Sequence, residues 1–292
     1  MGTEFIQQIF NGLIIGFTYA LMAVGLTMIF GIMRIVNFAH GEFYMLGAFA
    51  VYTFVALLKV NYFISLFLSV SVVVLVALAC ERFLLRRVRL ESEAASLLVT
   101  IALSVLFQNI VLLGYGAVPR SVPSPFSPIP LAIGCVSLNS IRLFSVITTA
   151  IIILVIHLLI QKTRLGMAVR ATFQDREAAS LVGVSIDRIY FFIFGLGCGL
   201  AAVGGALLGS VFLVYPSMGE LVIAKSFVVV IMAGMGNFPG AVFSGLILGV
   251  AESLGAGFVS SGYKDAIGFV IVIFVLLLRP SGLFGKLKEA SR

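Results

Sequence analysis

Nine apolar runs follow one another along this chain of 292 residues, with only short polar stretches between most of them. They lie at about residues 5–33, 43–58, 62–80, 94–113, 145–161, 187–214, 222–235, 240–258 and 264–278. A helix that crosses a bilayer needs about 20 apolar residues, so most runs can cross, whereas 43–58 and 222–235 are short for a full span. The pattern predicts an all-α fold, a polytopic membrane helix bundle of eight or nine crossings that include short or broken helices.

The composition leaves little room for a separate soluble domain. Hydrophobic residues make up 61% of the chain and charged residues 11%, against about 45–50% and 25% in soluble domains. We therefore expect residues 1–292 to form a single transmembrane domain. The first apolar run continues far beyond a signal-peptide core, which predicts a retained first helix.

Motifs for catalysis or metal binding do not emerge from the sequence. Cys80, Cys135 and Cys198 are scattered, without a CxxC pair or a histidine cluster, so neither a metal site nor a disulfide is indicated. A G-x-x-x-x-G-K-[ST] phosphate loop is missing, so the chain cannot hydrolyse ATP by that route. We expect a protein that is not an enzyme and binds no cofactor itself.

The basic residues predict the orientation in the membrane. If all nine runs cross, 14 of the 19 basic residues fall on one side: Arg34, Arg82, Arg86, Arg87, Arg89, Lys162, Arg164, Arg170, Arg176, Arg188, Arg279, Lys286, Lys288 and Arg292. The other side receives Lys59, Arg120, Arg142, Lys225 and Lys264. Positive loops stay in the cytoplasm, so the N-terminus should lie outside and the C-terminus inside. Topology thus explains the net charge of +7, and nucleic acid binding is not indicated.

Two further patterns concern loops and packing. The outward loop at 114–144 contains five prolines and should be extended and irregular rather than helical. Glycines at helix-packing spacing let helices approach closely in lipid, either within one bundle or at a subunit interface. These pairs are Gly12/Gly16, Gly195/Gly199, Gly205/Gly209 and Gly245/Gly249.

A compact polar stretch at 170–183 interrupts the apolar pattern on the cytoplasmic side. Thr172 and Asp175 match a capping box, and Gly183 is placed to end a helix in the left-handed conformation. We expect a helix from about Phe173 to Val182. Its small residues and mixed charge differ from the bulky anchors of a membrane-surface helix and suit a protein socket. The alternative is a solvated loop helix.

The same stretch resembles the EAA loop of ABC importer permeases. The resemblance rests on Glu177-Ala178-Ala179-x-x-x-Gly183, followed by Ile193. The Leu-Pro that usually follows the isoleucine is absent, and Gly195 and Leu196 stand there instead. The resemblance implies a coupling helix, in a loop within 162–186, seated in a groove of an ATP-binding subunit. The residues implicated in ATPase coupling are Arg170, Thr172, Asp175, Glu177, Ala178, Ala179 and Gly183.

Blocks along the whole chain resemble high-affinity branched-chain amino acid permeases. They include Asn37-Phe-Ala-His-Gly-Glu42, Gly234-Met-Gly-Asn-Phe-Pro-Gly240 and Arg279-Pro-Ser-Gly-Leu-Phe-Gly285. The resemblance implies a permease subunit in the bacterial inner membrane that imports leucine, isoleucine or valine. Its implied partners are a second related permease, two ABC ATPase subunits that hold ATP and Mg, an extracytoplasmic binding protein and membrane lipid. Related permeases handle urea, short amides or other amino acids, and these remain alternatives.

Five polar residues are candidates for the substrate pathway. Asn37, His40 and Glu42 lie in a possible break between helices, where exposed backbone is tolerated if it lines a cavity. The alternative is a cytoplasmic turn in which Glu42 serves the next helix. Asn237-Phe238 repeats Asn37-Phe38 after 200 positions, as a duplicated half would. Glu252 is an acid inside an apolar run and either marks function or bonds a neighbouring helix; Gln108 and Asn109 share that ambiguity.

Taken with the resemblance, these features favour alternating access driven by a separate motor. Movement of the loop helix would rock the flanking runs at 145–161 and 187–214. An ion-coupled secondary transporter would need acids or polar groups at the membrane midplane, for which Glu252 is a thin basis. A passive channel would need no docking helix.

Overall fold

The computed structural model describes residues 2–89, 92–126, 131–133 and 136–285. Cys135 and the basic tail residues Lys286, Lys288 and Arg292 lie outside these ranges. The helices are α1 (Gly2–Met33), α2 (His40–Tyr52), α3 (Tyr62–Cys80), α4 (Arg86–Val88), α5 (Glu93–Tyr115), α6 (Ser140–Lys162), α7 (Arg164–Gln174), α8 (Arg176–Leu181), α9 (Ile186–Leu208), α10 (Met218–Ala233), α11 (Phe238–Phe258) and α12 (Lys264–Leu278). π-Helical turns at Thr53–Leu57 and Glu81–Leu85 extend α2 and join α3 to α4, and a 3₁₀ turn at Ser261–Tyr263 precedes α12.

The helical membrane bundle is confirmed, with a correction to its count of crossings. Among the described residues, seven helices are long and apolar enough to cross a membrane. The two remaining apolar runs form α2 and α10, which have 13 and 16 residues. They are the runs that looked short in the sequence, and they are half-helices rather than full spans.

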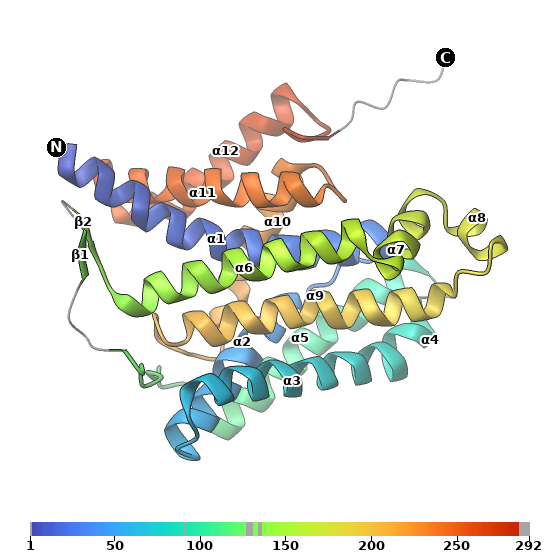
Figure 1. Ribbon diagram of the computed structural model, residues 1–292, viewed down its shortest axis with the longest axis horizontal. Helices are drawn as coiled ribbons and strands as arrows, with labels where there is room; N and C mark the ends of the chain where they lie inside the picture. Colours follow the sequence, from blue (N-terminus) through green and yellow to red (C-terminus); the bar gives the residue numbers. More distant parts are fainter. Residues whose placement is uncertain (1, 90–91, 127–130, 134–135, 286–292) are drawn as a thin grey trace.

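The long loop between α5 and α6 adds the strands β1 (Leu131–Ile133) and β2 (Val136–Leu138), which pair in antiparallel fashion. This pair departs from the all-α expectation. Residues 116–126 are irregular, as the prolines predicted, and Arg120 exchanges backbone hydrogen bonds with Val214. The hairpin lies at the same end of the bundle as the N-terminus, and α4, α7 and α8 lie at the opposite end (Figure 1).

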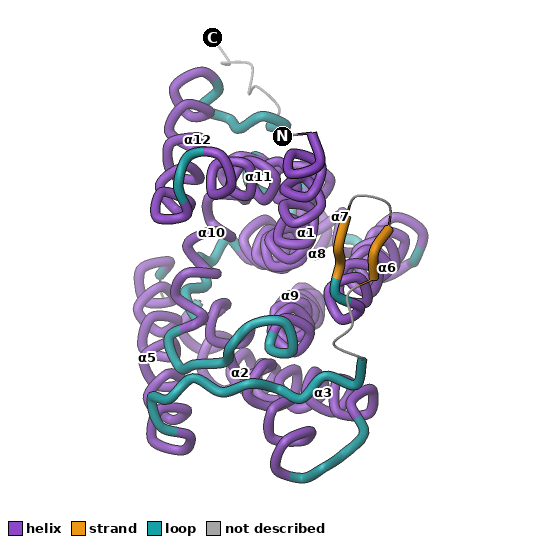
Figure 2. Tube along the Cα trace, turned by 90° about the vertical axis from the view of Figure 1, so that its left-hand side faces the viewer, coloured by secondary structure: helices purple, strands orange, loops and turns teal. Residues whose placement is uncertain are grey.

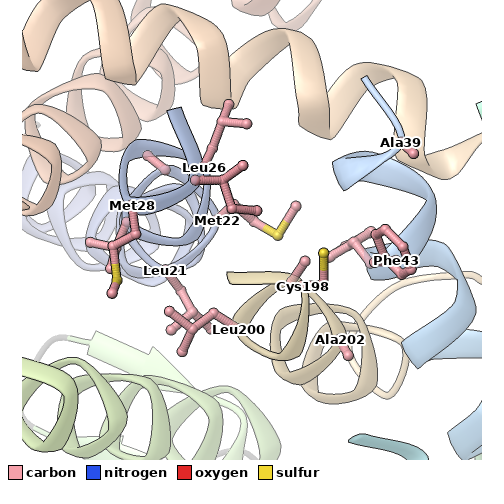
Figure 3. Packing of buried hydrophobic residues seen from close by; sticks show 14 of the residues in the cluster. Leu21, Met22, Leu26, Met28, Ala39, Phe43, Cys198, Leu200 and Ala202 are labelled. Atoms are coloured by element: carbon pink, nitrogen blue, oxygen red, sulfur yellow. The ribbon is translucent and has the colours of Figure 1, made fainter. Parts of the chain in front are cut away.

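Glycines hold the central helices at close range, because neighbouring backbones occupy the space that a side chain would fill. A Cβ atom on Gly12 of α1 would lie 2.5 Å from the Cα of Val250 in α11, and one on Gly16 would lie 2.9 Å from the Cα of Leu246. Gly245 and Gly249 of α11 face α1 in the same way. These pairs therefore serve packing within the bundle. Figure 3 shows the adjoining core, where Met22 of α1, Phe43 of α2 and Cys198 of α9 lie toward one another.

Two re-entrant segments shape the centre of the molecule. After α1 ends, Arg34 adopts a left-handed backbone with φ of 56° and the chain folds back into the bundle. The ring Nε2 of His40, the first residue of α2, lies 3.1 Å from the carbonyl oxygen of Met22. Met22 is 11 residues before the end of α1, which corresponds to about 16 Å of helix. Since the bilayer core is about 30 Å thick, α2 begins near its middle.

The half-helix α10 begins at the same level. The backbones of Gly41 in α2 and Gly219 in α10 meet, since a Cβ on Gly219 would lie 2.5 Å from the carbonyl oxygen of Gly41. From this meeting point α2 continues toward the outer end and α10 toward the inner end. The stretch at 34–39 is therefore an interrupted helix at membrane depth, and the alternative of a simple cytoplasmic turn is wrong.

The bundle contains two similar sets of helices that run in opposite directions. The first set is α1, α2, α3 and α5, and its counterparts are, in the same order, α9, α10, α11 and α12. α11 packs on α1 as α3 packs on α9, and α10 contacts α1 as α2 contacts α9. Such inverted repeats are common in transporters. The expected correspondence between Asn37 and Asn237, 200 residues apart, is wrong. Asn37 precedes the half-helix α2, whereas Asn237 caps the full span α11.

Candidate functional site

The loop between α6 and α9 forms two helices rather than one. Thr163 caps α7 by accepting a hydrogen bond from the Gly166 N–H at 3.0 Å. Asp175 caps α8, because its Oδ1 accepts from the N–H groups of Glu177 and Ala178 at 2.9 and 3.0 Å. The predicted helix from Phe173 to Val182, capped by Thr172, is therefore wrong.

Thr172 lies instead inside α7, where it is buried and donates to the Ala168 carbonyl at 2.9 Å. The helix breaks at Asp175, whose extended backbone has φ of −150°. Aspartate is among the strongest N-cap residues and ranks above threonine, so Asp175 rather than Thr172 begins the second helix.

The end of α8 agrees with the sequence prediction and leaves an apolar surface. Gly183 has φ of 88°, and the following N–H of Val184 donates to the Ala179 carbonyl at 3.0 Å. Ala179 is buried, whereas Glu177 and Ala178 are exposed. Beyond them, Leu181 and Val182 are 87% and 80% exposed. We call these two residues the apolar tip; α8 carries it out from the end of the bundle (Figure 1).

α7 anchors this projecting element to the bundle. The Arg170 guanidinium donates to the Ile160 carbonyl at the end of α6. The Phe173 ring fills the space beside Gly31 of α1 and Gly236, since a Cβ on either glycine would lie within 3.0 Å of that ring. Close contacts thus connect α7, which precedes α8, to α6 and α1.

A second connection runs through Tyr190 near the start of α9. The Arg176 guanidinium of α8 lies 5.4 Å from the Tyr190 ring centre, and that of Arg89 lies 4.6 Å from it. Arg89 also pairs with Glu81 at 3.1 Å and with Asp187. We call Arg89, Arg176 and Tyr190 the Tyr190 cluster. The cluster therefore connects α8 to α9 and to the α3–α4 segment.

The predicted residues Asn37, His40 and Glu42 come together where α2 begins, and all three are buried. The Asn37 Nδ2 faces the Cys198 sulfur at 4.0 Å, and the Glu42 Oε1 accepts from the Ser104 hydroxyl at 3.1 Å. Each residue also has a buried polar atom without a partner among the described residues: Asn37 Oδ1, His40 Nδ1 and Glu42 Oε2. Buried polar atoms of this kind are rare and require an explanation.

A polar row on α5 passes this point and continues toward the end of the bundle that carries α7 and α8 (Figure 1). Its members stand four residues apart: Ser96, Thr100, Ser104 and Gln108. The Thr100 hydroxyl donates to the Val36 carbonyl at 3.1 Å, and the Gln108 Nε2 donates to Glu220 of α10 at 2.6 Å.

At the inner end of the row lies a cavity of about 790 Å³. Its walls include Arg34, Val36, Glu93, Leu97, Phe173 and Met235. Gln108 was an ambiguous candidate, whereas Glu220 was not anticipated. The sequence signal that could have identified Glu220 is its position as an acid just before a short apolar run.

The other candidates lie apart from this cluster. Asn237 caps α11, with its Oδ1 accepting from Gly240 N–H at 2.9 Å and its Nδ2 donating to the Phe284 carbonyl at 2.7 Å. Glu252 bonds neighbouring helices, which was one of its two expected roles. Its Oε1 lies 2.5 Å from the Lys225 Nζ and its Oε2 accepts from the Tyr19 hydroxyl at 2.9 Å.

Lys225 overturns one assignment made from the charge pattern. The residue was placed with the outward basic residues, but it lies inside α10 and is fully buried. Its ammonium group also pairs with Asp265 at 3.1 Å. A lysine is tolerated inside this apolar run because acids on α11 and at the start of α12 neutralise its charge.

Comparisons with known proteins agree on one family. A family profile described as the permease component of branched-chain amino acid transport systems matches residues 8–276. The chain is 36% identical to the high-affinity branched-chain amino acid transport system permease protein LivH of Salmonella typhimurium strain LT2, with 97% of this chain and 96% of that protein covered. It is 34% identical to the corresponding permease protein BraD of Pseudomonas aeruginosa, over 97% of this chain and 96% of that protein.

A solved structure supports the fold. The complex of PsaBC from Streptococcus pneumoniae with a Fab contains a chain that superimposes with a TM-score of 0.55, at 13% identity, over 96% of this chain and 97% of that one. At this identity the likeness concerns the arrangement of helices alone. The residue matches and the membrane bundle lead to one assignment: the chain is a multi-pass membrane protein and belongs to the family of branched-chain amino acid transport system permease components.

Proposed function

We propose that this chain is the membrane-spanning subunit of an ATP-driven importer that carries leucine, isoleucine and valine across the bacterial inner membrane. Its relatives are permeases of branched-chain amino acid systems. ATP hydrolysis would take place on two separate ABC subunits, which hold ATP and Mg. A second related permease and an extracytoplasmic binding protein complete the assembly. The N-terminus would lie outside and the C-terminus in the cytoplasm.

The observation that carries this proposal is the exposed apolar tip at the end of α8, which α7 attaches to the bundle through close contacts. Leu181 and Val182 are each at least 80% exposed at the end that the basic residues mark as cytoplasmic. An exposed apolar surface of this kind is typical of a protein contact. Asp175 and Gly183 fix the shape of α8, while Glu177 and Ala178 stand on its exposed surface.

Coupling would pass inward along two connections. One runs from α7 through Arg170 and Phe173 to α6 and α1. The other runs through the Tyr190 cluster to α9 and the α3–α4 segment. Thr172 and Ala179 serve this transfer as buried packing residues rather than as contacts with the ATPase.

The substrate pathway would follow the polar row of α5. Asn37, His40 and Glu42 border it at the start of α2, and the 790 Å³ cavity is its cytoplasmic end. We assign Asn237 and Glu252 to the structure of the bundle, because neighbouring groups already satisfy their side chains.

Copurification and uptake test this function directly. The full chain is expressed with its genomic neighbours, reconstituted in proteoliposomes and assayed for ATP-dependent leucine uptake. Glu177→Lys or Gly183→Trp should abolish ATPase copurification and uptake together, whereas Ser71→Ala on the exposed side of α3 should leave both unchanged. Uptake that persists without any ATPase subunit would refute the importer and favour a carrier or channel.

The alternative cargoes are urea, short amides and other amino acids. A permease family profile does not distinguish among them, because the binding protein sets much of the selectivity. Direct binding of leucine, urea and acetamide to the associated binding protein decides between the cargoes.

A further inference from the structure

Two acids, one from the start of each half-helix, bond to neighbouring members of the α5 polar row. Glu42 lies in the first turn of α2 and Glu220 in the first turn of α10. Their neighbours Gly41 and Gly219 meet backbone to backbone, and the two carboxylates bond to Ser104 and Gln108, which are one turn apart on α5. We call Glu42 and Glu220 the acidic pair. Figure 2 shows α10 between α5 and α12, on the side of the bundle away from α6.

The two acids differ in their access to the surroundings. Glu220 is exposed, and among the described residues its side chain bonds to Gln108 of α5. Glu42 is 2% exposed, and its Oε2 has no partner among the described residues. A charged group near the bilayer middle is costly unless it faces water or a partner. An exposed acid at this depth therefore marks the wall of an aqueous route rather than a surface that faces lipid.

The acidic pair lacks a compensating cation within the described part of the chain. The basic residue closest in sequence to Glu220 is Lys225 on the same helix, but its ammonium group is bound to Glu252 and Asp265. The side chains that bond to the two acids are neutral: Gln108 bonds to Glu220, and Ser104 bonds to Glu42. The site thus carries excess negative charge and attracts a small cationic group.

Apolar side chains adjoin the acids on the same half-helices. Leu221, next to Glu220, is 46% exposed. Phe38, just before α2, is 36% exposed, and its ring lies 5.4 Å from that of Phe227 in α10. A ligand that combines a cationic group with an aliphatic side chain matches both features.

We propose that the acidic pair is a transit subsite for the ammonium group of the transported amino acid. Glu220 receives the ammonium from the route, Glu42 adds its unpaired carboxylate oxygen behind it, and Gln108 orients Glu220. The aliphatic side chain meets Leu221 and Phe38. This assignment deepens the proposed function and rests on it, and it favours an amino acid over urea or an amide, since neither of those carries a positive charge.

Uptake by a charge-neutral variant tests the subsite. In the reconstituted assembly, Glu220→Gln keeps the size of the side chain and removes its charge. We expect leucine uptake to fall by about tenfold or more, which corresponds to roughly 1.4 kcal/mol of lost transition-state stabilisation, while ATPase stimulation by the leucine-loaded binding protein persists. Wild-type uptake by this variant would overturn the subsite. Failure of the unmodified assembly to import leucine would instead overturn the proposed function.

A second measurement needs no uptake by the variant. Leu221→Cys places a thiol beside Glu220, and its reaction with cationic and anionic methanethiosulfonates reports the local charge. The cationic reagent should react at least fivefold faster, leucine-driven turnover should slow it, and adding Glu220→Gln should remove the preference. Equal rates for both reagents, or no reaction with either, would overturn the proposal.

Leu75→Cys on α3 provides a matched control. Leu75 is 66% exposed, and its neighbour Val74 contacts α9 at Gly199, close to where α9 meets α1 at Gly25. The position is therefore at a similar depth but faces away from the acidic pair. A thiol there should resist both water-soluble reagents, because it faces lipid.

Discussion

The buried charges around Lys225 allow a prediction whose size follows from the structure. The Lys225 ammonium group lies 2.5 Å from Glu252 and 3.1 Å from Asp265, and the Tyr19 hydroxyl donates to Glu252. Lys225 and Glu252 are fully buried, whereas the Asp265 side chain is 53% exposed. The cluster ties α1, α10, α11 and the start of α12 together.

Replacing Lys225 alone should lower the free energy of unfolding far more than replacing Lys225 and Glu252 together. Loss of one partner of a buried ion pair destabilises a protein by about 3–5 kcal/mol, because the other charge remains buried and unpaired. Lys225→Met should fall in that range, since it leaves Glu252 without its cation. Glu252→Gln should cost less, because Lys225 keeps Asp265 and a glutamine oxygen can still accept from Tyr19. Replacing both with apolar side chains of similar size is often nearly neutral, so the double variant Lys225→Met, Glu252→Leu should recover most of the loss.

Reversible unfolding in mixed micelles measures these free energies. The variants, together with the single change Glu252→Leu, are titrated with SDS and followed by circular dichroism. The double-mutant cycle of Lys225→Met and Glu252→Leu gives the coupling between the two sites. We expect the single costs to fail to add by several kcal/mol. If the double variant unfolds at the sum of the two single losses, the charges are not paired in the membrane and the reasoning is refuted.

Three smaller changes test other parts of the structure. Gly205→Ala should destabilise the protein by about 1–3 kcal/mol, because the new methyl group would collide with the backbone of α2; Gly114→Ala, where nothing lies within 4 Å, should be neutral or stabilising in the same SDS titration. Tyr190→Ala should lower leucine uptake per ATP hydrolysed, because it removes the ring that Arg176 contacts, and Tyr190→Phe should retain coupling. Asp175→Ala should lose about 0.5–2 kcal/mol of helix-capping stability and weaken ATPase copurification, whereas Asp175→Asn should behave as wild type; an unchanged yield of ATPase with Asp175→Ala would contradict the role of the cap.

The sequence predicted the features that depend on local pattern. Runs of apolar residues located the membrane helices, and Gly183 located the end of α8 because only a left-handed residue fits there. The capping prediction was wrong because both Thr172 and Asp175 can begin a helix. The choice between them depended on α7, whose packing against the bundle buries Thr172.

Features that depend on distant contacts could not be predicted in this way. Lys225 appeared to belong to an outward loop, since its partners Glu252 and Asp265 are 27 and 40 residues away. The sequence analysis did not single out Glu220, because its position depends on where α10 begins relative to α2. A half-helix that begins inside the membrane and a short helix that crosses it give apolar runs of the same length. The contact between Gly41 and Gly219, which lies inside the bundle, distinguishes them.

One helix connects the motor side of this molecule to the acidic pair. α9 begins beside α8, where Tyr190 contacts Arg176, and it then passes Asn37 at Cys198 before it packs along α2. Its contacts with α1 and α2 are made through glycines such as Gly197 and Gly205, whose backbones touch the neighbouring helices directly. Surfaces without interlocking side chains let helices shift by small rigid displacements. In the proposed importer, a push on α8 would therefore reach the start of α2 as a movement of the whole of α9, and we expect the two acids there to change their access when the motor closes.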